Sequence, residues 1–206
     1  MSISSKYLII IFFLVASCIS FTNEVSGQRK AAFLVGLNLS SFESQVDSFS
    51  SKSRIGWQFG GDLLLGRGIL NFQPGLFYTR VGNEITTLSP IGFTEQFFRH
   101  TIKVPLNLCL NLVRTDLLGI RLYGGLTGTY SLKVDENDLG VEIDDFYRII
   151  LGGNGGLGVD VLFFTADLRY EFGLSEVFNK SAQEEYFQFG DGLKNNIISL
   201  SVGLNF

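Results

Sequence analysis

From Ala31 to the C-terminus, apolar and polar residues alternate with a period of two. The clearest stretch runs from Phe98 to Asn111, where apolar residues such as Ile102 and Leu106 alternate with the polar residues Arg99, Thr101, Lys103, Asn107 and Asn111. This period places apolar side chains on one face of a β-strand and polar side chains on the other. The same pattern predicts eight strands, over residues 31–41, 54–65, 70–79, 98–111, 120–132, 147–159, 164–172 and 198–206.

The connections between these segments alternate in length. Long connections cover residues 42–53, 82–95, 134–144 and 174–192, and short ones cover residues 66–68, 113–118 and 160–161. Short turns at one end and long loops at the other are typical of outer-membrane barrels. The pattern therefore predicts an all-β fold, an eight-stranded antiparallel up-and-down transmembrane β-barrel with both termini on the short-turn side.

The composition narrows the class of protein. Hydrophobic residues make up 46% of the chain and charged residues 17%, against about 25% charged residues in a typical soluble domain. Beyond the N-terminal segment there is no apolar run of about 18 residues, as a spanning helix requires, so the remaining membrane architecture is a closed barrel. The net charge of −4 differs from the basic charge that is typical of proteins that bind nucleic acid, so we expect no nucleic-acid partner.

The N-terminus has the features of an export signal. Lys6 is followed by the apolar residues 7–16, and Val25-Ser26-Gly27 supplies small residues before a predicted cleavage site at Gln28. We therefore predict a signal peptide over residues 1–27 and a barrel domain over residues 28–206. Val15-Ala16-Ser17-Cys18 also resembles a lipobox, so lipidation of Cys18 stays open. Either way Cys109 is left alone, and no disulfide is expected.

Aromatic residues mark one edge of the apolar face. Six of them fall at the long-loop ends of their segments: Trp57, Tyr78, Phe98, Tyr130, Tyr147 and Phe172. Aromatic rings of this kind collect at the level of the lipid headgroups. They predict an interfacial girdle, contact with outer-membrane lipid, and location in the cell outer membrane.

Several stretches resemble a known family. The segments AFLVGLNLSSF, TIKVPLNL, RLYGGLTGTYSL, LGGNGGLGVDV and SVGLNF are together similar to the PorT-like outer-membrane β-barrel family over residues 31–206. The family tends toward a plain aliphatic run in its fourth strand, which Asn107 and Asn111 interrupt here on the polar face. The resemblance implies outer-membrane location and architecture, and some members serve protein-secretion or gliding machinery. Phe206 resembles the terminal signal read by the barrel-assembly machinery. No functional residues carry over.

Charged residues recur on the face predicted to line the lumen. They are the cations Arg54, Arg99, Lys103, Arg121, Arg148 and Arg169 and the carboxylates Asp62, Asp167 and Glu171. The interior of an eight-stranded barrel is just wide enough for side chains to fill, so we expect a salt-bridge network that closes the lumen. The excess of cations leaves a narrow, anion-leaning pore as an alternative.

Two motifs suggest chemistry that the sequence does not support. His100 is the single histidine, and no serine follows two residues later on its face to serve as a nucleophile, with Ser89 the nearest alternative.

Residues 153–158 match a dinucleotide-binding pattern, but a strand rather than a helix follows them. These glycines are expected to bend a strand or to make room for bulky lumen side chains of its neighbours. We expect no cofactor and no enzyme activity.

The long loops suggest interactions rather than chemistry. An acidic loop (Asp135, Glu136, Asn137, Asp138, with Glu142, Asp144 and Asp145) lacks the spacing of a calcium-binding EF-hand, and we expect no metal site. The longest loop carries Phe178, Tyr186, Phe187 and Phe189, which indicate a partner surface or a plug over the barrel mouth. The leading prediction is a structural or interaction protein. The alternatives are the narrow pore, a lipid-modifying enzyme, and a soluble lipocalin-type carrier with apolar residues inside.

Overall fold

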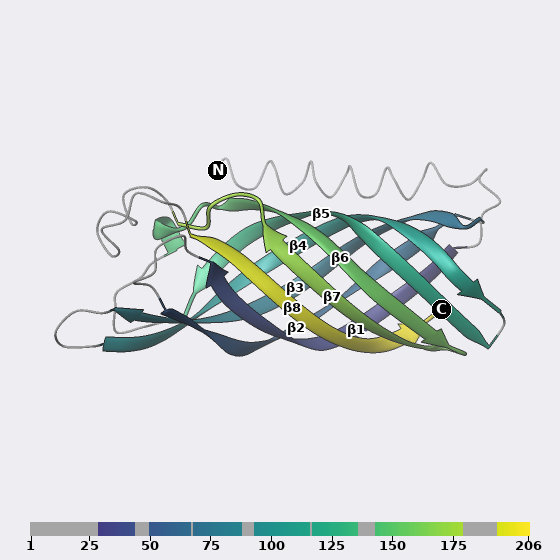
Figure 1. Ribbon diagram of the computed structural model, residues 1–206, viewed down its shortest axis with the longest axis horizontal. Helices are drawn as coiled ribbons and strands as arrows, with labels where there is room; N and C mark the ends of the chain where they lie inside the picture. The colour runs from purple at the N-terminus through teal and green to yellow at the C-terminus, as the bar shows by residue number, and fades with distance from the viewer. Residues whose placement is uncertain are drawn as a thin grey trace, which may run out of the picture.

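Eight strands form one closed ring. The computed structural model describes residues 29–43, 50–66, 68–87, 93–115, 117–135, 143–178 and 193–206. The elements are β1 (Arg29–Glu43), β2 (Ser50–Leu65), β3 (Leu70–Thr87), β4 (Phe93–Arg114), β5 (Leu118–Val134), the 3-10 helix η1 (Ile143–Asp145), β6 (Ile149–Val161), β7 (Phe164–Gly173) and β8 (Lys194–Asn205). Each strand pairs antiparallel with the next, and β1 pairs with β8 (Figure 1). The predicted eight-stranded antiparallel barrel is confirmed.

Some predicted features fall outside the described residues. The predicted signal peptide, the alternative lipid site at Cys18, and Ser89 all do so, as do most of the acidic loop and the longest loop. Cys109 is a free, buried thiol. Among the described residues, none of the helical structure is long and apolar enough to cross a membrane.

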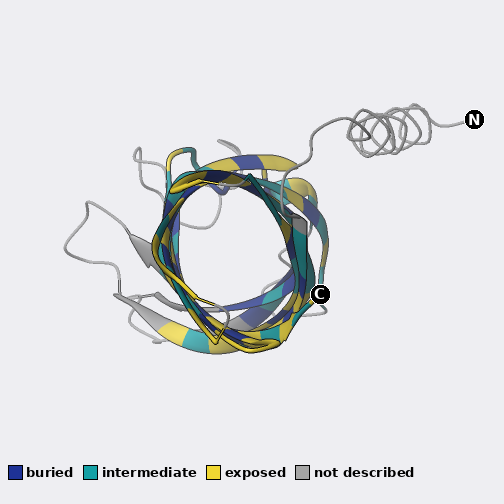
Figure 2. Ribbon diagram, turned by 90° about the vertical axis from the view of Figure 1, so that its right-hand side faces the viewer, coloured by how far each residue is buried: buried dark blue, intermediate teal, exposed yellow. Residues whose placement is uncertain are grey.

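Burial alternates along each strand because the two faces of the wall meet different surroundings. In β7 the alternation is complete from Phe164 to Phe172, with Thr165, Asp167, Arg169 and Glu171 buried and the residues between them exposed. Viewed along the barrel, dark and light segments alternate around the ring (Figure 2). The buried face is mostly polar and the exposed face apolar, which suits a wall surrounded by hydrocarbon. This is the reverse of a lipocalin-type carrier, so that alternative does not fit.

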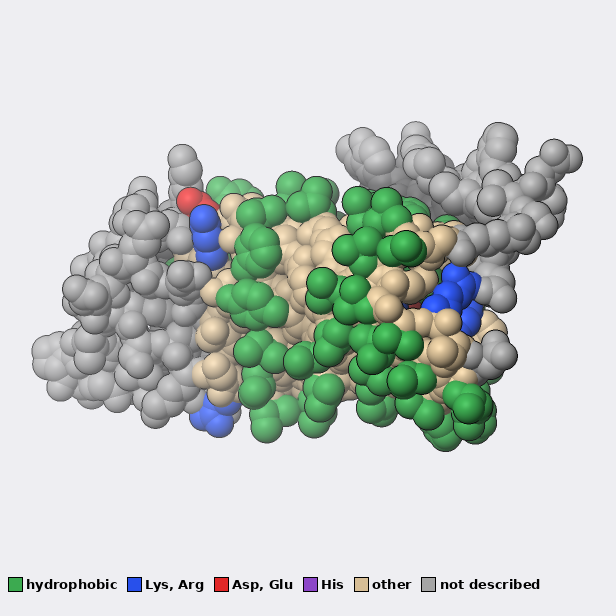
Figure 3. Space-filling model, turned by 45° about the vertical axis from the view of Figure 1, so that its right-hand side comes forward, with side chains coloured by type: hydrophobic (Ala, Val, Ile, Leu, Met, Phe, Trp, Pro, Cys, Tyr) green, Lys and Arg blue, Asp and Glu red, His purple; other side chains and the backbone are tan. Residues whose placement is uncertain are grey.

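The outer wall carries a broad band of apolar side chains. Large residues from every strand are exposed on it, including Leu37, Leu76, Leu126 and Leu200. Hydrophobic side chains cover the middle of the wall, while Lys and Arg side chains lie at its two ends (Figure 3). An apolar surface of this extent is far larger than a soluble monomer exposes.

Three strands continue beyond the ring at the end where the long connections lie, here called the loop end. Asn83–Thr87 of β3 pairs with Phe93–Phe97 of β4, and Ser50–Ser53 of β2 pairs with β3. Among the described residues, β1 pairs with β2 only as far as Arg54, and β5 pairs with β4 only as far as Arg99. These three segments form what we call the projecting sheet, at the left of Figure 1. Residues 82–95, predicted as a loop, are therefore largely strand.

Candidate functional site: a closed, charged lumen

A network centred on Arg121 fills the half of the lumen nearer the short turns, here called the turn end. Arg121 of β5 donates to Asp160 of β6 and, over 3.1 Å each, to Thr165 Oγ1 and Asp167 Oδ2 of β7. The Tyr123 hydroxyl donates to the second oxygen of Asp167. The guanidinium thus satisfies carboxylates from two other strands, as a buried charge requires.

Arg169 extends this network, and Asp62 lies on the lumen face of β2 in the same half of the barrel. Arg169 Nε donates to the Tyr123 hydroxyl over 3.3 Å, and its Nη2 lies 3.7 Å from Asp167 Oδ1. Asp62 of β2 accepts a hydrogen bond of 2.8 Å from Gln73 Nε2. The turn-end half of the lumen therefore holds two arginines and three carboxylates among the described residues.

One ion pair crosses the lumen toward the loop end. Lys103 Nζ of β4 lies 2.7 Å from Glu171 Oε2 of β7, and both side chains are almost fully buried. The strands β4 and β7 are not neighbours in the ring, so this contact joins opposite parts of the wall. Removing two charges from water is costly, and only close pairing of this kind offsets the loss.

Arg99 lies beside this pair without a carboxylate of its own. Its side chain is buried, and Nη1 donates to Ser131 Oγ over 3.3 Å. Its guanidinium carbon lies 5.2 Å from the centre of the Phe146 ring. Among the described residues, no Asp or Glu oxygen forms an ion pair with Arg99.

Three phenylalanines close the mouth at the loop end. Phe97, Phe146 and Phe178 are buried, with ring centres 4.5 Å apart for Phe146 and Phe178 and 5.9 Å apart for Phe97 and Phe146. Phe146 and Phe178 also form an isolated β-bridge. We call these three residues the aromatic plug. Of the loop aromatics predicted to form a partner surface or a plug, Phe178 belongs to the plug, whereas Tyr186, Phe187 and Phe189 lie outside the described residues.

Small cavities lie between the lumen side chains. Two cavities lie among the lumen side chains, one of about 20 Å³ near Arg121 and Asp160 and one of about 30 Å³ near Arg99 and Lys103. A single water needs roughly 10–15 Å³ of such space. Each of these two cavities therefore has room for one or two waters.

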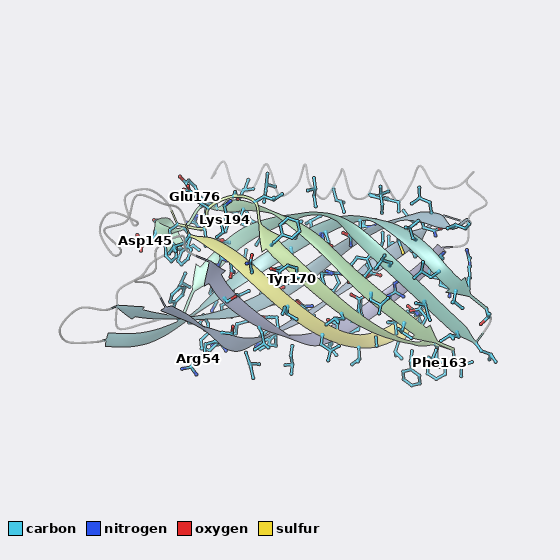
Figure 4. The ribbon with its side chains drawn as sticks, in the orientation of Figure 1. Arg54, Asp145, Phe163, Tyr170, Glu176 and Lys194 are labelled. Carbon is cyan, nitrogen blue, oxygen red and sulfur yellow. The ribbon has the colours of Figure 1, made fainter. Side chains whose placement is uncertain are left out.

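Seven of the nine predicted lumen charges lie in the lumen, and two do not. Arg148 is exposed just before β6 and pairs with Asp144 over 2.6 Å. Arg54 lies outside the wall at the loop end (Figure 4). The register between β2 and β3 shifts between Ser53 and Trp57, and a β-bulge of this kind reverses the faces of the residues beyond it.

The sequence pattern missed two members of the network. Asp160 was assigned to a turn, but β6 continues to Val161, so Asp160 shares the lumen face with Asn154. Extending the period-two pattern by one step would have found it. Tyr123 shares the predicted lumen face with Arg121, but an aromatic residue in a glycine-rich stretch does not by itself indicate a hydrogen bond to a carboxylate. The lumen therefore holds four cations (Arg99, Lys103, Arg121, Arg169) and four carboxylates (Asp62, Asp160, Asp167, Glu171) among its described residues, rather than six against three.

A second polar cluster lies on the outer wall at the loop end. The Tyr78 hydroxyl lies 2.6 Å from His100 Nδ1, His100 Nε2 lies 2.9 Å from Asp135 Oδ1, and Arg80 Nη2 lies 2.9 Å from Asp135 Oδ2. Burial would raise the pKa of Asp135, but the hydrogen bond from Arg80 and the interaction with His100 outweigh it and lower the pKa. Both ring nitrogens of His100 thus have hydrogen-bond partners, and the hydroxyl beside it belongs to a tyrosine rather than to a serine.

The six aromatics predicted as a girdle lie on the outer wall. Trp57, Tyr130, Tyr147 and Phe172 are exposed, while Tyr78 and Phe98 are half-buried. Trp57 lies 5.7 Å from Tyr78 between ring centres, and Arg80 stacks over Phe98 at 3.6 Å. Phe206 at the chain end is exposed, and its backbone N–H and carbonyl both pair with Ala31.

The acidic loop shows no metal site in its described part. Asp135 pairs with Arg80 and Asp144 with Arg148. No cluster of three or more His, Cys, Asp or Glu side chains suited to a metal ion occurs among the residues that the structure describes. Residues 136–142 lie outside that set.

Comparison with known proteins supports the fold. No protein-family model and no curated sequence matches the chain. Among solved structures, the chain is similar to the outer membrane protein OprG of Pseudomonas aeruginosa, with a TM-score of 0.50, 11% identity, and coverage of 87% of this chain and 97% of that one. Neisserial surface protein A (TM-score 0.49, 14% identity, coverage 85% and 97%) and Ail of Yersinia pestis (0.48, 11%, 87% and 99%) also match. These structural neighbours are outer-membrane eight-stranded β-barrel proteins.

Proposed function

We propose that this protein resides in the outer membrane of a Gram-negative-type cell, where it is a closed structural barrel that presents a partner-binding surface outside the cell. The observation that carries the proposal is the combination of a filled lumen with the projecting sheet. A transmembrane strand needs about 9–11 residues, whereas β3 has 18 and β4 has 22. The additional residues are not needed to cross the bilayer, and the Lys103–Glu171 pair and the aromatic plug obstruct the lumen.

The apolar outer wall supports the proposed location. Exposed apolar side chains on all strands call for lipid around the barrel, and the aromatic residues at the loop end suit the headgroup level. In this proposal residues 1–27 are a cleaved signal peptide, and the barrel-assembly machinery recognises the C-terminal strand that ends in Phe206. We further propose that the chain is a divergent PorT-like protein whose partner is a surface protein or part of a secretion machinery.

The alternatives are less well supported. A narrow anion-leaning pore was favoured by an excess of lumen cations, but the buried charges are balanced at four and four among the described residues. A lipid-modifying enzyme of the kind that pairs a histidine with a serine needs that serine beside the histidine, whereas His100 contacts Tyr78 and Asp135 among the described residues. We therefore propose a role that involves no catalysis and no cofactor.

Location is tested by membrane fractionation and by gel migration with and without boiling. A folded outer-membrane barrel resists SDS until it is heated, so the band is expected in the outer-membrane fraction and is expected to shift on boiling. A soluble periplasmic protein without a shift would overturn the proposed location.

The orientation and the interaction are tested with single substitutions at the two ends. Thr86→Cys lies in the projecting sheet, and Thr115→Cys lies at the turn between β4 and β5, whereas the native Cys109 is buried. A maleimide that cannot cross membranes should label Thr86→Cys on intact cells and Thr115→Cys only after permeabilisation. A photo-crosslinker at position 86, and not at position 115, should then capture a discrete surface partner. Equal capture from both positions, or from neither, would contradict the proposed partner surface.

A further inference from the structure

The lumen cavity beside Arg99 has an unusual lining. It measures about 30 Å³ and lies between β4 and β8 beneath the loop end of the barrel. Its polar lining consists of Arg99, Thr101, Lys103, Thr127, Thr129, Glu171 and Asn195. Glu171 is the single carboxylate among these residues, and it already pairs with Lys103 over 2.7 Å.

No carboxylate among the described residues is therefore left to compensate the charge of Arg99. Arg99 is only 2% exposed, and it donates a hydrogen bond to the Ser131 hydroxyl and lies over the face of the Phe146 ring. A buried guanidinium is rarely left without an anionic partner, because the cost of removing it from water is then not offset. The aromatic plug, which lies against Arg99 through Phe146, separates it from the loop end.

The unpartnered groups at the cavity are donors. Two lining side chains have a buried polar atom without a hydrogen-bond partner, and these atoms are Arg99 Nε and Asn195 Nδ2. The amide oxygen of Asn195 is already occupied, since it accepts a bond of 2.7 Å from the Ser40 hydroxyl. The amide N–H groups of Asn195 are thus left without an acceptor among the described residues.

We propose that this cavity is a binding site for one monatomic anion, with chloride as the natural occupant. The anion compensates the charge of Arg99 and accepts hydrogen bonds from Arg99 Nε and Asn195 Nδ2. A single water needs roughly 10–15 Å³, so the cavity has room for one ion slightly larger than water. A volume of about 30 Å³ suits a monatomic anion better than the larger phosphate, sulfate or organic carboxylates. A water in its place brings no charge.

This site differs from a pore. The anion is held beside Arg99 as part of the closed lumen, and the plug prevents its passage at the loop end. The two halves of the lumen also differ in their balance of charged side chains. The turn-end half has one carboxylate more than it has arginines, while the loop-end half has one cation more than carboxylates, and the anion removes that second imbalance.

The test is anomalous scattering from crystals of the folded barrel grown in sodium bromide. The wild-type protein is compared with Arg99→Gln and with the matched control Arg148→Gln, which removes an exposed arginine that pairs with Asp144. A bromide peak within contact distance of Arg99 is expected in the wild type and in Arg148→Gln and is expected to be lost in Arg99→Gln. The absence of a peak in the wild type overturns the proposal, and this arm needs no variant to fold.

A second measurement uses thermal unfolding in detergent at constant ionic strength. Replacement of gluconate by chloride should raise the Tm of the wild type and of Arg148→Gln, because a ligand that binds only the folded state stabilises it. The Tm of Arg99→Gln should not respond. An equal response in all three proteins indicates a general salt effect and overturns the site.

Discussion

Lys103 and Glu171 face each other across the lumen, and each is the other's ionic partner. Their side chains are 3% and 9% exposed, so neither is solvated if its partner is removed. A buried pair of this kind contributes little net stability compared with apolar residues, but an orphaned member is strongly destabilising. The two residues should therefore behave as one unit.

We expect Lys103→Met to lower the free energy of unfolding by about 3–5 kcal/mol, because Glu171 is then left buried and unpaired. The double variant Lys103→Met with Glu171→Gln should recover a large part of that loss. Urea unfolding of the four proteins in detergent provides the double-mutant cycle. If the costs of the two single substitutions simply add, the two residues are not coupled.

Asp135 should give the protein a distinct response to acid. Its pKa is lowered, because the hydrogen bond from Arg80 and the interaction with His100 outweigh the effect of burial. A lowered pKa in the folded state means that its stabilisation is present above the unfolded value of about 3.9. That stabilisation is lost as the pH falls through the lower, folded value.

Accordingly, the wild type should be more stable than Asp135→Asn at neutral pH, and the difference should shrink as the pH falls below about 4. Thermal unfolding of both proteins across acidic buffers measures this difference. Asp145→Asn is a suitable control, because Asp145 lies in η1 near the same end of the barrel. A difference between wild type and Asp135→Asn that does not change with pH would contradict the role of the carboxylate charge.

At the scale of the element, β6 shows how glycine spacing serves the lumen. A Cβ on Gly158 would lie 2.4 Å from Arg121 Cζ, and one on Gly156 would lie 2.3 Å from the Tyr123 hydroxyl. The prediction that these glycines make room for bulky lumen side chains of a neighbouring strand is confirmed. The two large residues of β5 can extend across β6 because β6 presents no side chain there.

Gly158→Ala should therefore destabilise the barrel by about 1–3 kcal/mol, the usual cost of overfilling a packed interior. Gly155→Ala is the matched control, because its added Cβ meets no atom closer than 3.7 Å. Urea unfolding in detergent compares both variants with the wild type. Equal losses in the two variants would indicate that strand propensity, and not lumen space, is responsible.

The β-bulge in β2 could not be predicted from the alternation of apolar and polar residues along the strand. Arg54 fits the polar face if the period of two is continued back from Gln58 and Asp62. One additional residue in the pairing with β3 shifts the register between Ser53 and Trp57. A bulge depends on the partner strand, so the sequence of β2 alone does not specify it.

At the scale of the whole molecule, we expect that the barrel does not conduct ions. The lumen is crossed by the Lys103–Glu171 pair and the Arg121 network and is capped by the aromatic plug. Purified protein in a planar bilayer is expected to leave the current at baseline, with insertion verified by the shift of its gel band on boiling. Reproducible unit steps of current would show that the lumen opens in a membrane.

The sequence by itself determined the strands, their number and the face of most residues, because the side to which a strand residue points depends only on its position along a regular strand. The seven lumen charges and the apolar outer wall were predictable for that reason. Only the tertiary structure decided which charges meet, since β4 and β7 come to face each other only when the ring closes. The tertiary structure also places Arg54 and Arg148 outside the lumen. It includes Asp160 and Tyr123 in the Arg121 network and positions Arg99 beside a cavity. Those outcomes depend on pairing register and on contacts between distant residues, which no local pattern encodes.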